Sequence, residues 1–252
     1  MTKFYCLFLV GLMCLAFAAP LLANEDEAIP TVGLQRVPVS LSPGGAVACG
    51  STIYENVGAT YFYSTTGTKW HVLDDGKFPA GTAPVCLGCI EFGWRQTTAQ
   101  QLFVVVDFWD TVVPGGPVCN LTWLGGFYVN FGVIPVGTWT SGPIDVSGLP
   151  TLITFPDDNW CVEFRYYKQI TPSLLTSTVA AVLFANGGPT VGTNNGTVYW
   201  RDANGNGAFE CPSEAYSFAS PNLAQFYLKL SATEEPSATE PTSWGTIKAF
   251  FR

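Results

Sequence analysis

The sequence has few of the residues and motifs on which common catalytic sites depend. It contains one histidine, His71, so any Ser-His-Asp or Cys-His arrangement would have to use this residue, which lies in an expected strand. No Gly-x-Ser-x-Gly elbow, P-loop or Gly-x-Gly-x-x-Gly motif followed by a helix is present. These absences predict a protein without a catalytic site and without a nucleotide cofactor.

Charged residues are also scarce, at 12% of the 252 residues, and they include no basic stripe. Nucleic acid is not an expected partner, because its recognition depends on clustered Lys and Arg side chains that contact phosphates and the formal net charge here is −8. Beyond residue 23 no apolar run is long enough for a membrane-spanning helix. We therefore expect no transmembrane anchor.

The amino-terminal segment has the layout of a cleaved secretory signal peptide. Lys3 precedes an apolar run that is too short to span a bilayer, and small residues ending at Ala23 are followed by Glu25-Asp26-Glu27. We expect removal of residues 1–23, with cleavage after Ala19 as the alternative. The mature chain is then expected to be secreted, and to be extracellular or held at the cell surface.

Six of the eight cysteines remain after residue 23, and an even number in an exported chain favours disulfides. Cys86 and Cys89 lie in an expected strand, where three steps of about 3.3 Å separate their Cα atoms by about 10 Å, beyond the roughly 7 Å limit for a disulfide. Unless Gly88 interrupts the strand, each needs a different partner. A redox Cys-x-x-Cys motif needs a helix amino terminus and a four-cysteine zinc site needs closely spaced ligand pairs, and neither context is present. We predict up to three disulfides, of undetermined pairing, among Cys49, Cys86, Cys89, Cys119, Cys161 and Cys211.

Alternation of apolar and polar residues predicts an all-β fold. The alternation has period two and recurs through the central region, while 26 glycines and 18 prolines supply turns, including an expected turn at Asp74-Asp75-Gly76. About ten strands at this spacing favour a two-layer antiparallel β-sandwich. The expected strands span 53–63, 70–73, 85–94, 102–110, 124–133, 152–155, 160–168, 179–185, 197–201 and 223–230.

Two of these strands indicate which side chains face the core. In 160–168, Val162, Phe164 and Tyr166 are expected inside, and Glu163 and Arg165 are expected to form a solvent-side polar face. In 223–230, the expected inward side chains are those of Ala224, Phe226, Leu228 and Leu230.

The composition divides the chain into five segments. After the signal peptide, 24–50 is an extension or first strand and 51–230 is the β-sandwich. Residues 231–242 form an acidic Pro/Ser/Thr linker with nothing to bury, and 243–252 form an apolar and basic tail. The tail either has a partner or folds back onto the sandwich.

The sharpest local motif is an oxygen-rich loop that follows the strand 197–201. Oxygen side chains alternate and Gly207 stands at the sixth position, as in the first half of an EF-hand calcium loop. The candidate calcium ligands are Asp202, Asn204, Asn206, the Ala208 carbonyl and Glu210. Ser213 replaces the bidentate Glu of an EF-hand, so the expected affinity is modest. An Asn- and Gly-rich turn without metal is the alternative.

Several stretches, taken jointly, resemble one group of exported domains. They are Tyr61-Phe-Tyr63, Trp70-His-Val-Leu-Asp-Asp75, Ile90-Glu-Phe-Gly-Trp94, Val104-Val-Val-Asp-Phe-Trp-Asp110 followed by Pro114-Gly-Gly116, Asn159-Trp160, and Pro221-Asn-Leu-Ala-Gln-Phe-Tyr-Leu228. In this order, over 53–230, the chain resembles bacterial β-sandwich domains found in surface proteins with PEP-CTERM-type sorting signals. The resemblance implies a jelly-roll-like sandwich of undefined function, usually without catalytic residues. The tail lacks the Pro-Glu-Pro motif, the membrane span and the terminal arginine cluster of that sorting signal.

Three functions are compatible with these features. The first is a non-catalytic secreted or cell-surface domain with a structural or adhesive role, whose partner would be a glycan or another surface protein. The second is a carbohydrate-binding module, which would use a coplanar exposed set of aromatic residues drawn from Trp109, Trp123, Trp139 and Trp200. The third is a glycoside hydrolase, which needs two carboxylates about 5 to 10 Å apart. Its candidate acids are Asp107, Asp110, Glu91 and Glu163.

Overall fold

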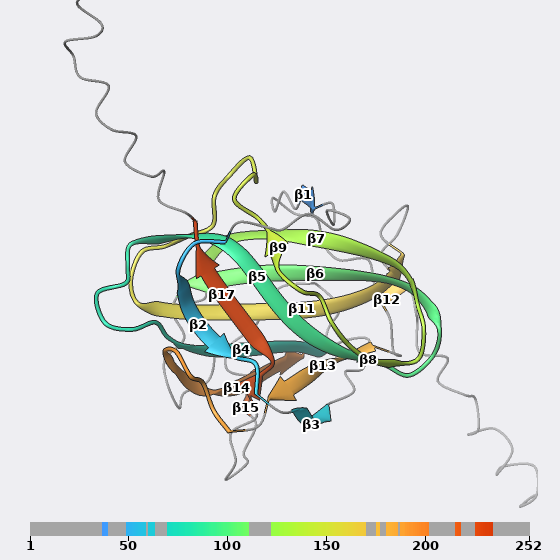
Figure 1. Cartoon of the computed structure of the whole chain (residues 1–252). Coiled ribbons are helices and arrows are strands. Elements are labelled where there is room, and N and C mark those ends of the chain that lie inside the picture. Colours follow the sequence, from blue (N-terminus) through green and yellow to red (C-terminus); the bar gives the residue numbers. More distant parts are fainter. Residues whose placement is uncertain are drawn as a thin grey trace, which may run out of the picture.

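A computed structural model of the chain shows two β-sheets packed face to face (Figure 1). It describes residues 37–39, 49–58, 60–63, 70–110, 122–169, 175–176, 180–185, 187–201, 215–217 and 225–233. The expected signal peptide (1–23), calcium loop (202–210) and tail (243–252) lie outside these ranges, as do Cys119 and Cys211.

One sheet, called here the β6 sheet, has eight strands. Its order is β1 (Val37–Val39), β7 (Thr122–Ile134), β6 (Gln100–Asp110), β11 (Asn159–Gln169), β4 (Trp70–Lys77), β14 (Thr193–Arg201) and β15 (Ala215–Ser217), and β12 (Leu175–Thr176) also pairs with β11. β1 is parallel to β7, and the other pairings are antiparallel. β6 and β11 therefore lie in the interior of this sheet.

The other sheet, called the β5 sheet, has nine strands. Its order is β16 (Gln225–Phe226), β13 (Ala180–Ala185), β5 (Val85–Gln96), β17 (Leu228–Ala232) and β2 (Thr52–Asn56). β3 (Thr60–Tyr63) pairs with β13, while β8 (Gly137–Thr140), β9 (Ile144–Asp145) and β10 (Thr154–Phe155) pair with β5. β5 thus forms the centre of this sheet, antiparallel to every partner.

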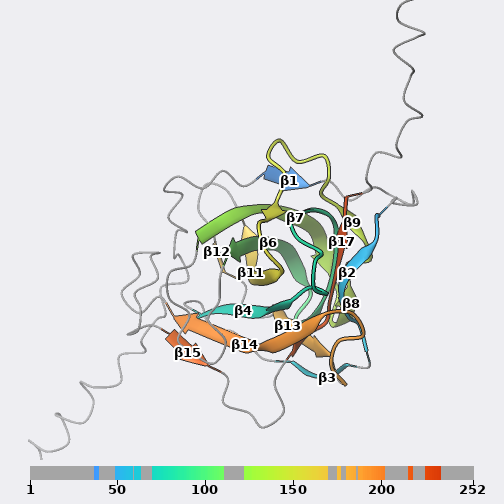
Figure 2. The ribbon, with the colours of Figure 1, turned by 90° about the vertical axis from the view of Figure 1, so that its left-hand side faces the viewer.

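The chain crosses repeatedly between the two layers, which Figure 2 shows side by side. Aromatic rings fill the space between them: Phe92 of β5 lies 4.8 Å from Phe164 of β11, measured between ring centroids, and Tyr54 of β2 lies 4.3 Å from Trp160. The predicted two-layer antiparallel β-sandwich is confirmed. Among the described residues, no helix is long and apolar enough to cross a membrane.

The inward faces of the strands agree with the alternation of the sequence. Val162, Phe164 and Tyr166 belong to the buried core, as do Phe226, Leu228 and Leu230. The number of strands exceeds the expected ten or so: the described part of the chain contains seventeen, several of them only two or three residues long. Short strands such as β8 and β9 carry too few residues for a periodic pattern to identify them.

The turn predicted at Asp74-Asp75-Gly76 is wrong, because β4 continues through these residues to Lys77. A Cβ atom on Gly76 would overlap the Thr193 carbonyl oxygen of β14 and approach the Trp160 ring to 2.7 Å. Gly76 is therefore required by close packing inside the sheet rather than by a turn.

Candidate functional site

Asp107 and Glu163 lie directly opposite each other on β6 and β11 and project from the same face of the β6 sheet. Arg165, two residues further along β11, projects from that face as well. It is the face turned away from the core, since the alternating residues Val162 and Phe164 belong to the core cluster.

The expectation that Glu163 and Arg165 form a solvent-side polar face is wrong. Their exposed fractions are 1% and 8%, and that of Asp107 is 0%. Buried charges need partners, and these three side chains provide them for one another. We call Asp107, Glu163 and Arg165 the charged cluster.

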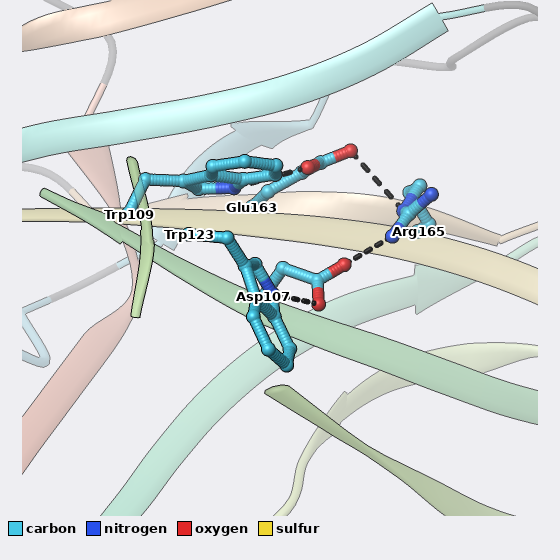
Figure 3. Close-up of polar contacts among 5 residues, drawn as sticks. All are labelled: Asp107, Trp109, Trp123, Glu163 and Arg165. Atoms are coloured by element: carbon cyan, nitrogen blue, oxygen red, sulfur yellow. Dashed lines mark hydrogen bonds and ion pairs between the residues drawn. The ribbon is translucent and has the colours of Figure 1, made fainter. Parts of the chain in front are cut away.

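The guanidinium of Arg165 contacts both carboxylates (Figure 3). Its Nη2 donates a hydrogen bond to Asp107 Oδ2, and its Nε lies 3.1 Å from Glu163 Oε1. Burial lowers the pKa of Arg165, but the negative charges of Glu163 and Asp107 outweigh this effect and raise the pKa above its ordinary value. The guanidinium therefore stays charged.

Two tryptophans complete the arrangement from adjacent strands. Trp109 of β6 and Trp123 of β7 are register partners. Trp109 Nε1 donates to Glu163 Oε2 at 3.2 Å, and Trp123 Nε1 donates to Asp107 Oδ1 at 2.9 Å. Each carboxylate thus contacts Arg165 through one oxygen, by a hydrogen bond for Asp107 and by an ion pair for Glu163, and accepts an indole hydrogen bond through the other (Figure 3). Both tryptophans are half-buried.

A glycine on β7 makes room for this arrangement. Gly126 is the register partner of Asp107, and a Cβ atom on it would overlap Asp107 Oδ1. The absence of a side chain at this position lets the carboxylate lie over β7, within reach of the Trp123 indole.

The geometry does not suit glycoside hydrolysis. That chemistry places the substrate between two accessible carboxylates, one of them protonated. Here both acids are buried, and each forms an ion pair with the Arg165 guanidinium. The other candidate acids do not join them, since Asp110 is the last residue of β6 and Glu91 lies on β5 in the opposite sheet.

The candidate tryptophans do not form one set. Trp109 and Trp123 lie side by side on the β6 sheet, whereas Trp139 is on β8 in the β5 sheet. Trp139 is 37% exposed, and its indole donates to the Pro135 carbonyl at 3.0 Å. The backbone of Trp200 lies in β14. The indoles of Trp109 and Trp123 are hydrogen-bonded to the candidate acids Glu163 and Asp107.

One disulfide is present among the described cysteines, between Cys49 and Cys89. The inference that Cys89 does not pair with Cys86 is confirmed, because β5 runs through both. Cys86 and Cys161 are free thiols. They lie on different sheets, on β5 and β11, with their neighbours Leu87 and Val162 filling the core between them.

A second buried polar cluster was not predicted from the sequence. Asp74 is fully buried and accepts hydrogen bonds from Asn194 Nδ2 at 2.9 Å and from the Phe226 backbone N–H at 2.8 Å. It therefore joins β4 and β14 to β16 of the opposite sheet. Burial raises the pKa of Asp74 from 3.8 to about 8, and burial likewise raises the pKa of Asp75 to about 6.

Metal sites and related proteins were the remaining sources of evidence on function. In the part of the chain that the structure describes, no three His, Cys, Asp or Glu side chains group in a way that could hold a metal ion. The predicted calcium ligands, Asp202 to Glu210, lie outside that part. The chain matches no family model, no curated protein and no solved structure.

Proposed function

We propose that the protein is a non-catalytic, secreted or cell-surface β-sandwich domain with a structural or adhesive role. The observation that carries this proposal is the charged cluster. It is the place where two of the candidate acids meet, and there Arg165 and the two indoles occupy all four carboxylate oxygens. Such a cluster fixes the positions of side chains and offers no acid or base to a substrate.

The disulfide supports the location outside the cell. Disulfides form and persist in oxidising compartments, and Cys49–Cys89 closes a segment with a sequence separation of 40 residues. The signal-like segment that ends at Ala23 favours the same compartment.

Expression of the full chain in an exporting host tests this proposal. We expect the protein in the exported fraction, with Asn24 as its first residue and with the Cys49–Cys89 bond detectable by peptide mass mapping. We also expect no turnover of a panel of glycoside substrates. Retention inside the cell, or hydrolysis that Asp107→Asn or Glu163→Gln abolishes without unfolding the protein, would contradict it.

A second candidate function is carbohydrate binding through Trp109 and Trp123. The two half-buried indoles lie on adjacent strands, and their N–H groups are held by Glu163 and Asp107. Rings that are fixed in this way lose little conformational freedom when a sugar ring stacks on them.

Titration with soluble oligosaccharides, followed by tryptophan fluorescence, tests this second candidate. We expect Trp109→Ala and Trp123→Ala each to weaken binding, and Trp139→Ala to leave it unchanged because Trp139 lies on the other sheet. A response that is equal in all three variants would argue against the pair as the binding surface.

A further inference from the structure

A groove lies on the outer face of the β5 sheet, on the opposite side of the sandwich from the charged cluster. It has a volume of about 270 Å³, and its lining consists of Cys49, Cys89, Ile90, Glu91, Pro143, Lys229 and Ser231. The Cys49–Cys89 disulfide and Pro143 supply apolar surface, while Glu91 and Lys229 supply charge.

Three charged residues lie in a row across this face. Lys229 of β17 is the register partner of Glu55 on β2 and also of Glu91 on β5. The cation thus stands between two carboxylates on neighbouring strands.

Lys229 is paired with only one of these two carboxylates. Its Nζ lies 2.8 Å from Glu55 Oε1, and this bond, ahead of the opposing effect of partial burial, lowers the pKa of Glu55. Glu55 also accepts a hydrogen bond from the Thr190 hydroxyl at 3.1 Å.

Glu91 has a neutral partner instead of a cation. The Tyr227 hydroxyl donates to Glu91 Oε1 at 3.2 Å, and among the described residues no Lys or Arg forms an ion pair with this carboxylate. Glu91 therefore gives the half-buried groove a negative charge that the surrounding side chains do not neutralise.

The chemistry of the groove determines the kind of group that fits it. A cationic head with an apolar stem would place its charge on Glu91 and its methylene groups against the disulfide and Pro143. Arginine and lysine side chains have this form, and the net charge of −8 attracts basic partners at long range.

We propose that this groove binds an arginine or lysine side chain from a basic segment of a partner protein, with Glu91 as the residue that receives the charge. This proposal rests on the adhesive role proposed above and names the class of partner. The binding test needs only the purified mature chain. A negative result in it is therefore distinguishable from a failure of export or from enzyme activity, which would contradict the proposed function.

The test is a ¹H–¹⁵N NMR titration of the mature chain with the blocked peptide acetyl-Gly-Arg-Gly-Arg-Gly-amide. The matched ligand replaces each arginine with citrulline, which has a similar shape and no charge. We expect saturable shifts of the amides of Glu91, Lys229 and Ser231 with the arginine peptide and none with the citrulline peptide.

Three variants of the protein make the test specific. Glu91→Gln is expected to weaken binding at least about tenfold, the effect of losing one charge-assisted hydrogen bond. Lys229→Met removes the neighbouring ammonium that repels the ligand and is expected to tighten binding. Asp157→Asn removes the same charge as Glu91→Gln from an exposed position outside the groove and is expected to bind as the wild type.

Equal affinities of wild type and Glu91→Gln, or equal losses in Glu91→Gln and Asp157→Asn, would overturn the proposal. If Glu91→Gln does not fold, Lys229→Met tests the proposal alone. Unchanged or weaker binding of the arginine peptide to Lys229→Met would then overturn it, because a cation held beside Lys229 should bind more tightly once the ammonium is removed.

Discussion

Replacing Arg165 with methionine isolates the contribution of the charged cluster to stability. The variant keeps an unbranched apolar side chain but removes the Arg165 guanidinium, which forms ion pairs with Asp107 and Glu163. Both carboxylates are buried, with exposed fractions of 0% and 1%, so water cannot replace the lost cation. Breaking a buried ion pair by removing one partner costs about 3 to 5 kcal/mol.

Equilibrium urea unfolding under oxidising conditions measures this loss. We expect Arg165→Met to lower the free energy of unfolding by about 3 to 5 kcal/mol. Arg95→Met is the control, since Arg95 is half-buried on β5 and its Nη1 donates to the Thr138 hydroxyl at the surface. Its expected loss is below about 1 kcal/mol.

The triple variant Arg165→Met/Asp107→Asn/Glu163→Gln separates charge from shape. It removes the cation together with both anions, so no uncompensated charge stays buried, and it should recover most of the stability that the single variant loses. A loss of unfolding free energy below about 1 kcal/mol in Arg165→Met would refute the view that the charged cluster is shielded from solvent and stabilised by its ion pairs.

Four further changes have defined outcomes. Cys89→Ser opens the disulfide, whose sequence separation of 40 residues corresponds to about 4 kcal/mol of chain entropy, measured as lost free energy of unfolding. Asp74 has a pKa raised by burial from 3.8 to about 8, so the folded state binds a proton that the unfolded state releases. The stability that this proton binding by Asp74 contributes is fully present below pH 3.8 and is lost as the pH rises through about 8. The Tm of the wild type should therefore fall more steeply over this pH range than the Tm of Asp74→Asn. Gly126→Ala places a Cβ atom against Asp107 Oδ1 and should cost about 1 to 3 kcal/mol in urea unfolding, while Gly148→Ala, which meets no neighbour within 4 Å, should cost less. If the loop 202–210 binds calcium, calorimetry of the mature chain should show heat, and its Tm should fall with chelator in wild type but not in Asp202→Ala.

The fold class was predictable because side-chain alternation is a local property of each strand. The pattern in β11 and β17 identified Phe164 and Leu228 as core residues without knowledge of their partners. The alternation of apolar and polar residues indicates which side chains share a face of the strand. It does not indicate whether the face turned away from the core is exposed to solvent. For this reason the pattern predicts the correct face for Glu163 and Arg165 but not their burial.

The charged cluster depends on long-range register, which the sequence does not show. Asp107 and Glu163 become neighbours only because β6 and β11 pair in one particular register. One signal was present: Val104-Val-Val-Asp-Phe-Trp109 is apolar on both faces, as expected of a strand buried on both sides. A carboxylate in such a strand needs a buried partner, which in the structure is Arg165.

The pairing of Cys49 with Cys89 was unpredictable for the same reason.

The turn expected at Asp74-Asp75-Gly76 rested on the local preferences of these residue types. These residue types favour turns when their side chains face water. Here the Asp74 carboxylate bonds to Asn194 and to the Phe226 backbone, so tertiary contacts outweigh the local preference.

The outward-facing charges of the two sheets are paired in different ways, and this difference indicates which face can bind a charged partner. On the β6 sheet, Asp107 and Glu163 share one guanidinium, so that face gives stability and rigid positions. On the β5 sheet, Lys229 pairs with Glu55, and Glu91 keeps a neutral tyrosine hydroxyl as its partner. A binding partner that recognises charge therefore has more to gain from the groove at Glu91 than from the mutually paired charges of the opposite face.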